Sequence, residues 1–287
     1  MQGPQTEHSK ELLSNSANLR QAERIFHEWA QLPITHDEFV GRLEVLHRKY
    51  FPNAQPLPGV QELLDGLRES NPTVHLALAT SSHRSGFDLK AGHLQDLFSV
   101  FKEEHRVLGD DPRIRSGRGK PAPDIYLLAL QTINQSLKAS GQSELYPEEC
   151  LVFEDSVPGV EAGRRAGMQV VWCPHSGLLD EYRGREKEVL AGLMGEHKED
   201  ESLARTHSID MQIDGIRPHA RVLGVPGEID DGWARLFRSL EEFPFEWYGI
   251  EIPANVLKQI PSSCFGDLST NPNRNQTIPR EQFSGGA

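Results

Sequence analysis

The sequence predicts an α/β fold in which parallel strands alternate with helices. The clearest sign is the stretch Cys150–Pro174, where an apolar run (Cys150 to Phe153) stops at two adjacent acids and a second apolar run (Gln169 to Cys173) follows. A helix-sized segment rich in small residues separates the two runs, as in a minimal strand–helix–strand unit. Earlier apolar runs also end in polar residues. This is typical of parallel strands, whose carboxyl ends meet at one edge of a sheet.

The first part of the chain predicts a small helical lobe. From Leu12 to Phe51, apolar residues recur at helical spacing, and Pro33 interrupts the pattern. Thr35 and Glu38 form a capping-box pattern for a second helix that runs through Tyr50. We interpret the apolar stripes as packing faces of two antiparallel helices.

The first predicted strand of the core ends in three hydroxyl side chains. The strand runs from Val74 to Ala79, and Thr80, Ser81 and Ser82 follow it before a helix that starts at about His83. Hydroxyl donors and free backbone N–H groups at a helix start form a favourable anion site. The alternative is that a serine merely caps the helix.

A lysine precedes the helix predicted from Asp124 to about Lys138. It follows a short strand that ends in V-L-G-D-D-P and a basic loop that leads to Lys120. A cation just before a helix N-terminus is unfavourable with the helix dipole unless an anion lies between them. We therefore expect Lys120 to meet a phosphate or a carboxylate, and the alternative is a solvated loop lysine.

Two adjacent acids, Glu154 and Asp155, follow the strand at 150–153. Their mutual repulsion would be offset by a divalent cation, and Mg²⁺ is usually held by one or two carboxylates plus phosphate oxygens. Two ordinary surface acids are the alternative. Because strand–helix alternation brings the strand ends to one sheet edge, the hydroxyls at 80–82, Lys120 and the acid pair together predict a site for phosphate and a metal ion.

Length and composition limit the classes of partner. A chain of 287 residues indicates two structural units or one domain with a large insertion. A net charge of −12 argues against a nucleic-acid backbone as the main partner. Cys150, Cys173 and Cys264 show no metal-ligand spacing and fit a reducing compartment. The sequence shows no membrane span and no signal-peptide pattern. We expect a cytoplasmic monomer without membrane or nucleic-acid partners.

The last third of the chain carries weaker patterns. A strand is predicted at Arg221–Val225, a helix from Asp230 to about Glu242, and an apolar closing segment at 243–252. The charged insert near 195–208 and the polar residues 255–287 are typical of disorder.

Three motifs resemble those of the haloacid dehalogenase (HAD)-like hydrolase superfamily. A-L-A-T-S-S (Ala77–Ser82) resembles the family's second motif, K-P-A-P-D-I-Y (Lys120–Tyr126) the third, and F-E-D-S-V-P-G-V-E-A-G-R-R-A-G-M (Phe153–Met168) the fourth. V-L-G-D-D-P, the Pro-rich segment at 51–59 and S-L-E-E-F resemble the pseudouridine-5'-phosphatase-like branch in particular. The resemblance covers roughly residues 12–174 and a short piece at 233–252.

This resemblance implies a Rossmann-like core with a parallel sheet and a partial helical cap. The expected domains are the partial cap at 1–55, the HAD-like α/β core at 56–254 with its charged insert, and a disordered tail at 255–287.

The resemblance also implies a Mg²⁺-dependent phosphatase for a small phosphomonoester, such as a pseudouridine 5'-phosphate-like compound or a nucleoside or sugar phosphate. In the family, an aspartate attacks phosphorus and a second aspartate, two residues later, acts as general acid and base. In this sequence Thr80 and the Ser81 backbone would bind phosphoryl oxygens. Lys120 would act as the catalytic lysine that neutralises phosphate and nucleophile, and Glu154 and Asp155 would hold Mg²⁺.

The family's first motif, D-x-D-x-[TV], is absent, and no D-x-D occurs anywhere in the chain. The only aspartates before Thr80 are Asp37 and Asp65, and neither follows an apolar strand. We expect the chain as given to lack phosphatase activity and to be unstable alone, and we interpret it as a truncated form. A non-catalytic pseudophosphatase that binds or regulates is the alternative. A phosphomutase or dehalogenase of the same superfamily is a third hypothesis.

Overall fold

The computed structural model describes residues 24, 26–70, 73–195 and 223–253. The chain divides into two compact units. The first comprises Met1–Gln55 and Leu76–Leu236, and the second comprises Pro56–His75 and Phe237–Ala287. The domain boundaries expected from the sequence stay predictions. The tail at 255–287 and nearly all of the insert near 195–208 lie outside the described residues.

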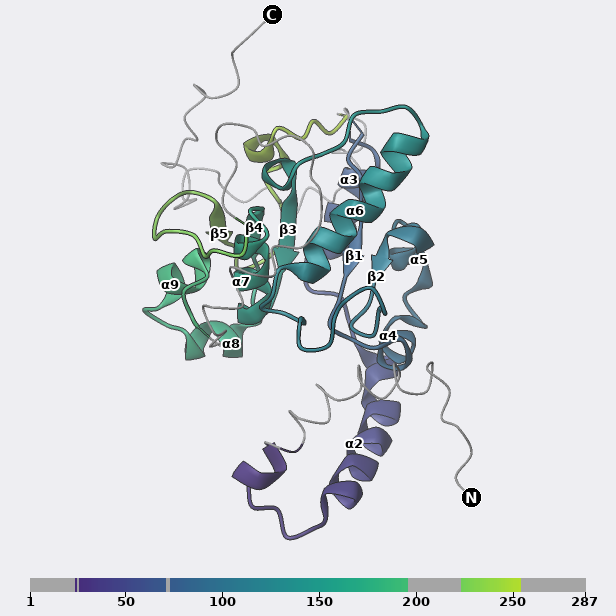
Figure 1. Cartoon of the computed structure of the whole chain (residues 1–287), viewed down its shortest axis with the longest axis vertical. Coiled ribbons are helices and arrows are strands. Elements are labelled where there is room, and N and C mark those ends of the chain that lie inside the picture. The colour runs from purple at the N-terminus through teal and green to yellow at the C-terminus, as the bar shows by residue number, and fades with distance from the viewer. Residues whose placement is uncertain (1–23, 25, 71–72, 196–222, 254–287) are drawn as a thin grey trace, which may run out of the picture. The chain divides into compact units, whose positions relative to one another are not determined.

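The first unit alternates strands with helices, as the sequence predicts (Figure 1). Its elements in chain order are α2 (His36–Tyr50), η1 (Phe51–Asn53), β1 (Leu78–Ala79), α4 (Arg84–Ala91), α5 (Gln95–Phe98), η2 (Glu103–His105), β2 (Arg106–Val107), α6 (Asp124–Ala139), η3 (Pro147–Glu149), β3 (Leu151–Glu154), α7 (Val157–Arg165), β4 (Gln169–Trp172), α8 (Ser176–Glu181), α9 (Glu186–Ala191) and β5 (Ala234–Leu236). No helix in the described ranges is long and apolar enough to cross a membrane.

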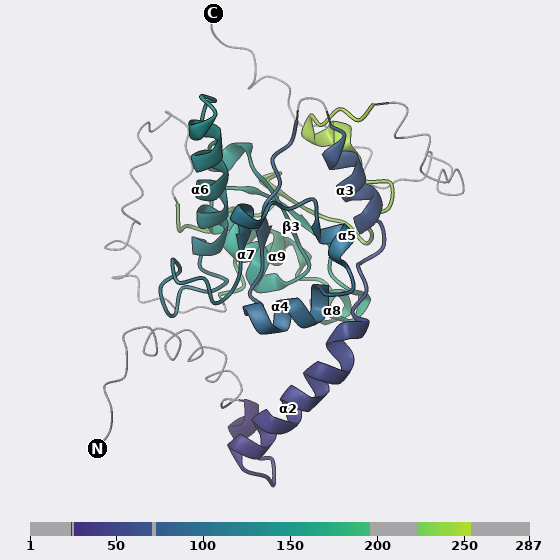
Figure 2. The same ribbon diagram turned by 90° about the vertical axis from the view of Figure 1, so that its right-hand side faces the viewer.

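The strands of this unit form two parallel sheets. β1 pairs with β2, and β4 lies between β3 and β5. Helix α6 packs on β1 and β2, and α7 packs on β3 and β4. Figure 2 shows α6, α7 and β3 from a second direction. The predicted α/β class with parallel strands is therefore confirmed.

The main core of the first unit joins α6, α7, β3 and β4. Val160, Ala162 and Trp172 have no exposed surface. Gly163 allows α7 to approach the sheet closely, because a Cβ atom there would lie 2.8 Å from Val170 Cγ2. This packing fixes the N-terminus of α7 directly after the end of β3.

The last strand of the sheet is not where the sequence predicts it. Residues 223–225 belong to no strand, whereas β5 lies within the segment expected to be helical and runs parallel to β4. Asp230 and Gly232 have φ values of +60° and +77°, in the left-handed region, and a right-handed helix cannot pass through them.

The Asp231 carboxylate explains why a turn and a strand form there instead. It accepts hydrogen bonds from the backbone N–H groups of Glu228 (3.1 Å) and Trp233 (3.0 Å) and pairs with the buried Arg164 side chain of α7. Because the partner lies 67 residues earlier, local patterning does not reveal it.

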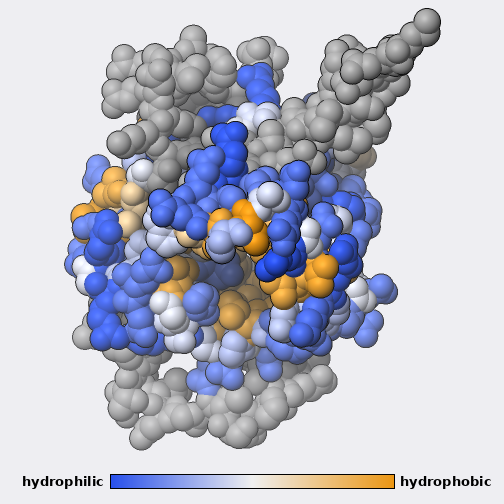
Figure 3. Space-filling model, turned by 90° about the horizontal axis from the view of Figure 1, so that it is seen from below, coloured by the Kyte–Doolittle hydropathy of each residue, from blue (hydrophilic) through white to orange (hydrophobic). Residues whose placement is uncertain are grey.

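Helix α2 confirms one half of the predicted capping box, since the Thr35 hydroxyl accepts from the Glu38 backbone N–H at 3.2 Å. The Glu38 side chain accepts from Arg42 at 2.7 Å instead. None of its residues is buried, so its predicted apolar face is packed only in part. Phe39 stacks on Phe26, whereas Leu46 and Tyr50 remain exposed. Figure 3 views the molecule from below, the side on which α2 is drawn in Figure 1, and shows apolar side chains at that surface. The helix continues into η1, which contacts α4.

The second unit is built on helix α3 (Val60–Arg68) and the 3₁₀ turn η4 (Phe245–Tyr248). Its buried hydrophobic residues are Leu63, Leu64, Leu67, Leu240, Phe243 and Phe245. The apolar closing segment expected at 243–252 thus packs as predicted. Gly59 has φ +82°, and a Cβ atom there would lie 2.0 Å from the Glu241 backbone nitrogen.

We expect Gly59→Ala to lower the free energy of unfolding of the second unit. The left-handed backbone costs a non-glycine residue about 1 kcal/mol, and the overlap with residue 241 adds about 1–3 kcal/mol. Gly249→Ala is the matched control, because Gly249 also has a positive φ (+68°) but open space around it. Urea unfolding followed by tryptophan fluorescence measures both variants. Equal losses in both would contradict the close approach at residue 59.

Candidate functional site

The end of β1 presents one backbone donor. The Thr80 N–H is bonded to Val107 O (3.0 Å), and the Ser82 N–H donates to Thr80 Oγ1 (3.1 Å). The Ser81 N–H has no acceptor within the described residues. This N–H, together with the Thr80 hydroxyl hydrogen, can therefore donate to an anionic oxygen.

One backbone N–H at the start of the following helix, α4, is already bonded to a carboxylate of the chain itself. The Arg84 N–H donates to both carboxylate oxygens of Asp110, at 3.1 and 3.0 Å. The neighbouring Gly109 N–H donates to Ser82 O (3.0 Å), and a Cβ atom at Gly109 would lie 2.2 Å from Ser81 O. The Asp110 carboxylate thus occupies the first N–H of the helix, and its loop holds the 80–84 turn in place.

Lys120 connects the ends of β1 and β3. Its Nζ atom donates to Ala79 O (3.3 Å), next to Thr80, and forms a buried ion pair with Glu154 Oε1. The Lys120 side chain is 10% exposed and lies over the Tyr126 ring, 4.9 Å from its centre. The expectation that Lys120 meets an anion is confirmed, and within the described residues that anion is a carboxylate.

Glu154 is surrounded by donors on both carboxylate oxygens. Oε1 accepts from Lys120 Nζ and the Tyr126 hydroxyl, and Oε2 accepts from the Ser156 N–H (3.2 Å) and Oγ (2.9 Å). The Ser156 Oγ also accepts from the Gly159 N–H (3.2 Å), so Ser156 caps α7. As it lies, Glu154 offers no vacant lone pair to a cation.

Asp155 differs from its neighbour. Its side chain is exposed, and within the described residues its carboxylate has no hydrogen bond or ion pair. Its backbone oxygen accepts from Trp172 Nε1 (3.3 Å), which fixes the turn. The described residues contain no cluster of three or more His, Cys, Asp or Glu side chains suited to a metal. Asp155 nevertheless fits Mg²⁺ as a single carboxylate that leaves positions for phosphate and water.

Tyr126 was missed as a site residue by the sequence reasoning. It lies in the first turn of α6, buried, with its hydroxyl on Glu154. Burial, and then the charge of Glu154, raise the pKa of Tyr126 well above its usual value, so the phenol stays a donor. Its place at the end of the K-P-A-P-D-I-Y motif was the available signal.

The two cysteines beside the acidic turn are free thiols, as predicted. Burial raises the pKa of Cys150 to about 12, and burial and the Asp155 charge raise the pKa of Cys173. Cys264 lies outside the described residues.

The two early aspartates do not supply a nucleophile. Asp37 lies in the first turn of α2 with a fully exposed side chain, and Asp65 pairs with Arg68 within α3 at 2.9 Å.

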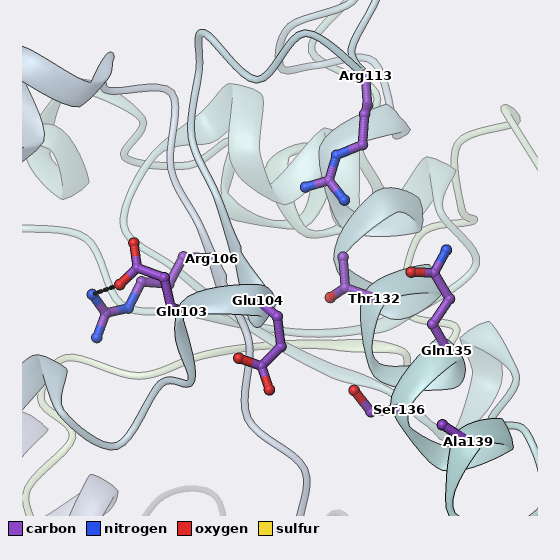
Figure 4. A pocket seen from close by; sticks show the side chains of 8 residues that line it. All are labelled: Glu103, Glu104, Arg106, Arg113, Thr132, Gln135, Ser136 and Ala139. Atoms are coloured by element: carbon purple, nitrogen blue, oxygen red, sulfur yellow. Dashed lines mark hydrogen bonds and ion pairs between the residues drawn. The ribbon is translucent and has the colours of Figure 1, made fainter.

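A polar hollow of about 370 Å³ lies between η2 and the second half of α6 (Figure 4). Its walls include Glu104, Arg113 and Gln135, and none of the predicted site residues lines it. Arg113 already pairs with Asp111 at 2.7 Å. Because none of the predicted site residues lines the hollow, we treat it as separate from the site at the strand ends.

Comparison with known proteins places the chain in a family. Residues 6–167 match the family model of haloacid dehalogenase-like hydrolases. A probable pseudouridine-5'-phosphatase of Saccharomyces cerevisiae is 40% identical over 148 residues, which are 52% of this chain and 59% of the relative. A probable pseudouridine-5'-phosphatase of Drosophila melanogaster is 36% identical over 170 residues, which are 59% of this chain and 68% of the relative.

A third relative is the (DL)-glycerol-3-phosphatase 1 of Arabidopsis thaliana, which is 34% identical over 161 residues, 56% of this chain and 50% of the relative. The chain thus spans about half to two thirds of the length of these relatives. The family model covers the second and third motifs in full. It covers the fourth motif up to Gly167, one residue before its last residue, Met168. The chain belongs to the haloacid dehalogenase-like hydrolases and, within them, to the pseudouridine-5'-phosphatase-like branch.

Proposed function

We propose that this chain carries the phosphate-binding and cation-binding part of a phosphatase for small phosphomonoesters. The observation that carries the proposal is the position of Lys120, whose ammonium lies between the end of β1 and Glu154 at the end of β3. The names of the relatives, two pseudouridine-5'-phosphatases and a glycerol-3-phosphatase, support a small phosphorylated metabolite as substrate.

In this proposal the Ser81 N–H and the Thr80 hydroxyl donate to phosphoryl oxygens, and the Lys120 ammonium offsets their negative charge. Such preorganised donors stabilise a transition state in which charge spreads over the phosphoryl oxygens. Asp155 would hold Mg²⁺, which, when bound, supplies a further positive charge beside the phosphate. The sequence-based assignment of Glu154 as a second ligand stays a prediction.

The chain as given lacks a side chain to attack phosphorus at this site. No D-x-D occurs in the sequence. Within the described residues, Asp110 follows β2 and accepts from the Arg84 N–H, and Asp155 follows β3. This absence favours a second candidate function, a non-catalytic protein that binds phosphomonoesters. Substrate binding is common to both candidates, whereas turnover separates them.

We expect the purified chain to release no phosphate from a chromogenic phosphomonoester in the presence of Mg²⁺. Without a nucleophile the covalent phosphoryl intermediate cannot form. Phosphate release over time is the measurement, with Asp155→Asn measured in parallel. Hydrolysis by the parent chain that disappears in Asp155→Asn would contradict the expectation and reveal a nucleophile elsewhere in the chain.

We expect Thr80→Val to weaken the binding of inorganic phosphate about tenfold. A hydrogen bond to a charged group contributes about 1.5 kcal/mol or more, which is about one factor of ten. Ser81→Ala is the matched control, because it keeps the backbone N–H that we assign to the phosphate. Isothermal titration in Mg²⁺ measures both variants. Equal affinities for Thr80→Val and the parent chain would remove Thr80 from the site.

A further inference from the structure

The ammonium group of Lys90, in the last turn of α4, lies beside the turn that follows β1. We propose that Lys90 is a second cation of the phosphate site, and that Phe51, in the segment after α2, is a positioning residue that holds the Lys90 ammonium there. Both residues belong to the first compact unit. The inference rests on the proposed function, because it concerns the anion that the 80–82 turn would bind.

The first argument is the contact between Lys90 and this turn. Lys90 Nζ donates to Ser82 Oγ at 3.1 Å, and the Ser82 N–H in turn donates to Thr80 Oγ1 at 3.1 Å. Ser81 lies between these two residues, is exposed, and has an N–H group without an acceptor in the described ranges. The Lys90 ammonium is thus attached to the same three residues that carry the two donors assigned to phosphate.

The second argument is the charge balance at the strand ends. In the part of the chain that the structure describes, the partners of Lys90 Nζ are the Ser82 hydroxyl and the Phe51 ring, and neither is charged. Lys120, by contrast, pairs with the Glu154 carboxylate. Lys90 is therefore the ammonium of the two whose charge no described carboxylate balances. An ammonium has three donors, so two remain for an anion after the bond to Ser82.

The third argument is the way in which Phe51 and α4 hold the side chain. The centre of the Phe51 ring lies 4.5 Å from Lys90 Nζ, within the range of a cation–π contact. The same ring stacks on His47, in the last turn of α2, with 4.3 Å between the ring centres. Gly86 lies one turn before Lys90 on α4, so no side chain blocks the lysine as it leans back toward the start of the helix. Phe51 thereby restricts the orientation of a half-buried lysine.

A purely structural role for these contacts predicts a different result. In that case the ammonium would only stabilise the contact between η1 and α4, and removal of its charge would lower the unfolding midpoint without changing the affinity for an anion. The proposed role requires the affinity for phosphate to follow the charge at residue 90. Phosphate affinity and thermal stability therefore have to be measured on the same variants.

Titration calorimetry of the full chain with inorganic phosphate and Mg²⁺ tests the role of Lys90. We expect Lys90→Gln, which keeps a donor for Ser82 but removes the charge, to weaken phosphate binding about tenfold. Lys90→Arg keeps the charge and should stay within about twofold of the parent chain. Lys138→Gln is the matched control for the loss of one positive charge and should bind phosphate as the parent does. Lys138 is exposed and lies about 21 Å along α6 from Asp124, at about 1.5 Å per residue.

A double-mutant cycle tests the role of Phe51. Phe51→Leu should weaken phosphate binding about threefold in the parent chain, because the ammonium loses its aromatic partner. In the Lys90→Gln chain the same change should have no effect on phosphate affinity, since Phe51 acts through Lys90. Thermal unfolding of each variant shows that it is folded.

Parent-like phosphate affinity of Lys90→Gln would overturn the role of Lys90. An equal loss of affinity on Phe51→Leu in both backgrounds would overturn the positioning role of Phe51. If Lys90→Gln does not fold, Lys90→Met, a substitution of similar length, decides the same question. A parent chain that binds no phosphate would overturn the proposed function together with this inference, whereas unchanged binding by Lys90→Gln would overturn the inference alone.

Discussion

The buried ion pair between Lys120 and Glu154 is the interaction on which the arrangement at the strand ends depends. β1 and β3 belong to separate sheets in the described part of the chain, so no backbone ladder joins their carboxyl ends. Lys120 provides the connection, with one bond to the Ala79 backbone and one to the Glu154 side chain. A buried pair of this kind adds little net stability, but loss of one partner costs about 3–5 kcal/mol. The main effect of the Lys120–Glu154 pair is therefore to fix the ends of β1 and β3 relative to each other.

Much of the fold and of the site could be predicted because the signals are local. The strand at 151–154, the Ser156 cap and the end of α7 at Gly167 lie within seventeen consecutive residues. Gly167 has a left-handed φ of +73°, which is typical of a glycine after a helix end. Parallel topology then brings Thr80, Lys120 and Glu154 together from three separate segments. The helix-dipole argument for Lys120 also succeeded, because it required only an anion nearby and did not specify which one.

The features that the sequence did not predict depend on partners that are distant in sequence. Asp110 fills the start of α4 from 26 residues away, and Asp231 reaches Arg164 across 67 residues. An aspartate in a D-D-P or D-D-G turn has the same local pattern whether it caps its own turn or another element. The contrast between Glu154 and Asp155 was also hidden, because it arises from Tyr126 on α6 and from the missing side chain of Gly159.

The surroundings of Cys173 determine how the site responds to oxidation. The residue directly follows β4, and its backbone N–H is bonded to Glu154 O at 2.7 Å. Burial and the negative charge of Asp155 both favour its neutral thiol, and oxidants and electrophiles attack the thiolate. The Asp155 carboxylate, which we propose as a cation ligand, therefore also protects the neighbouring sulfur. Peroxide levels that inactivate thiolate-dependent enzymes should leave these strand ends chemically unchanged.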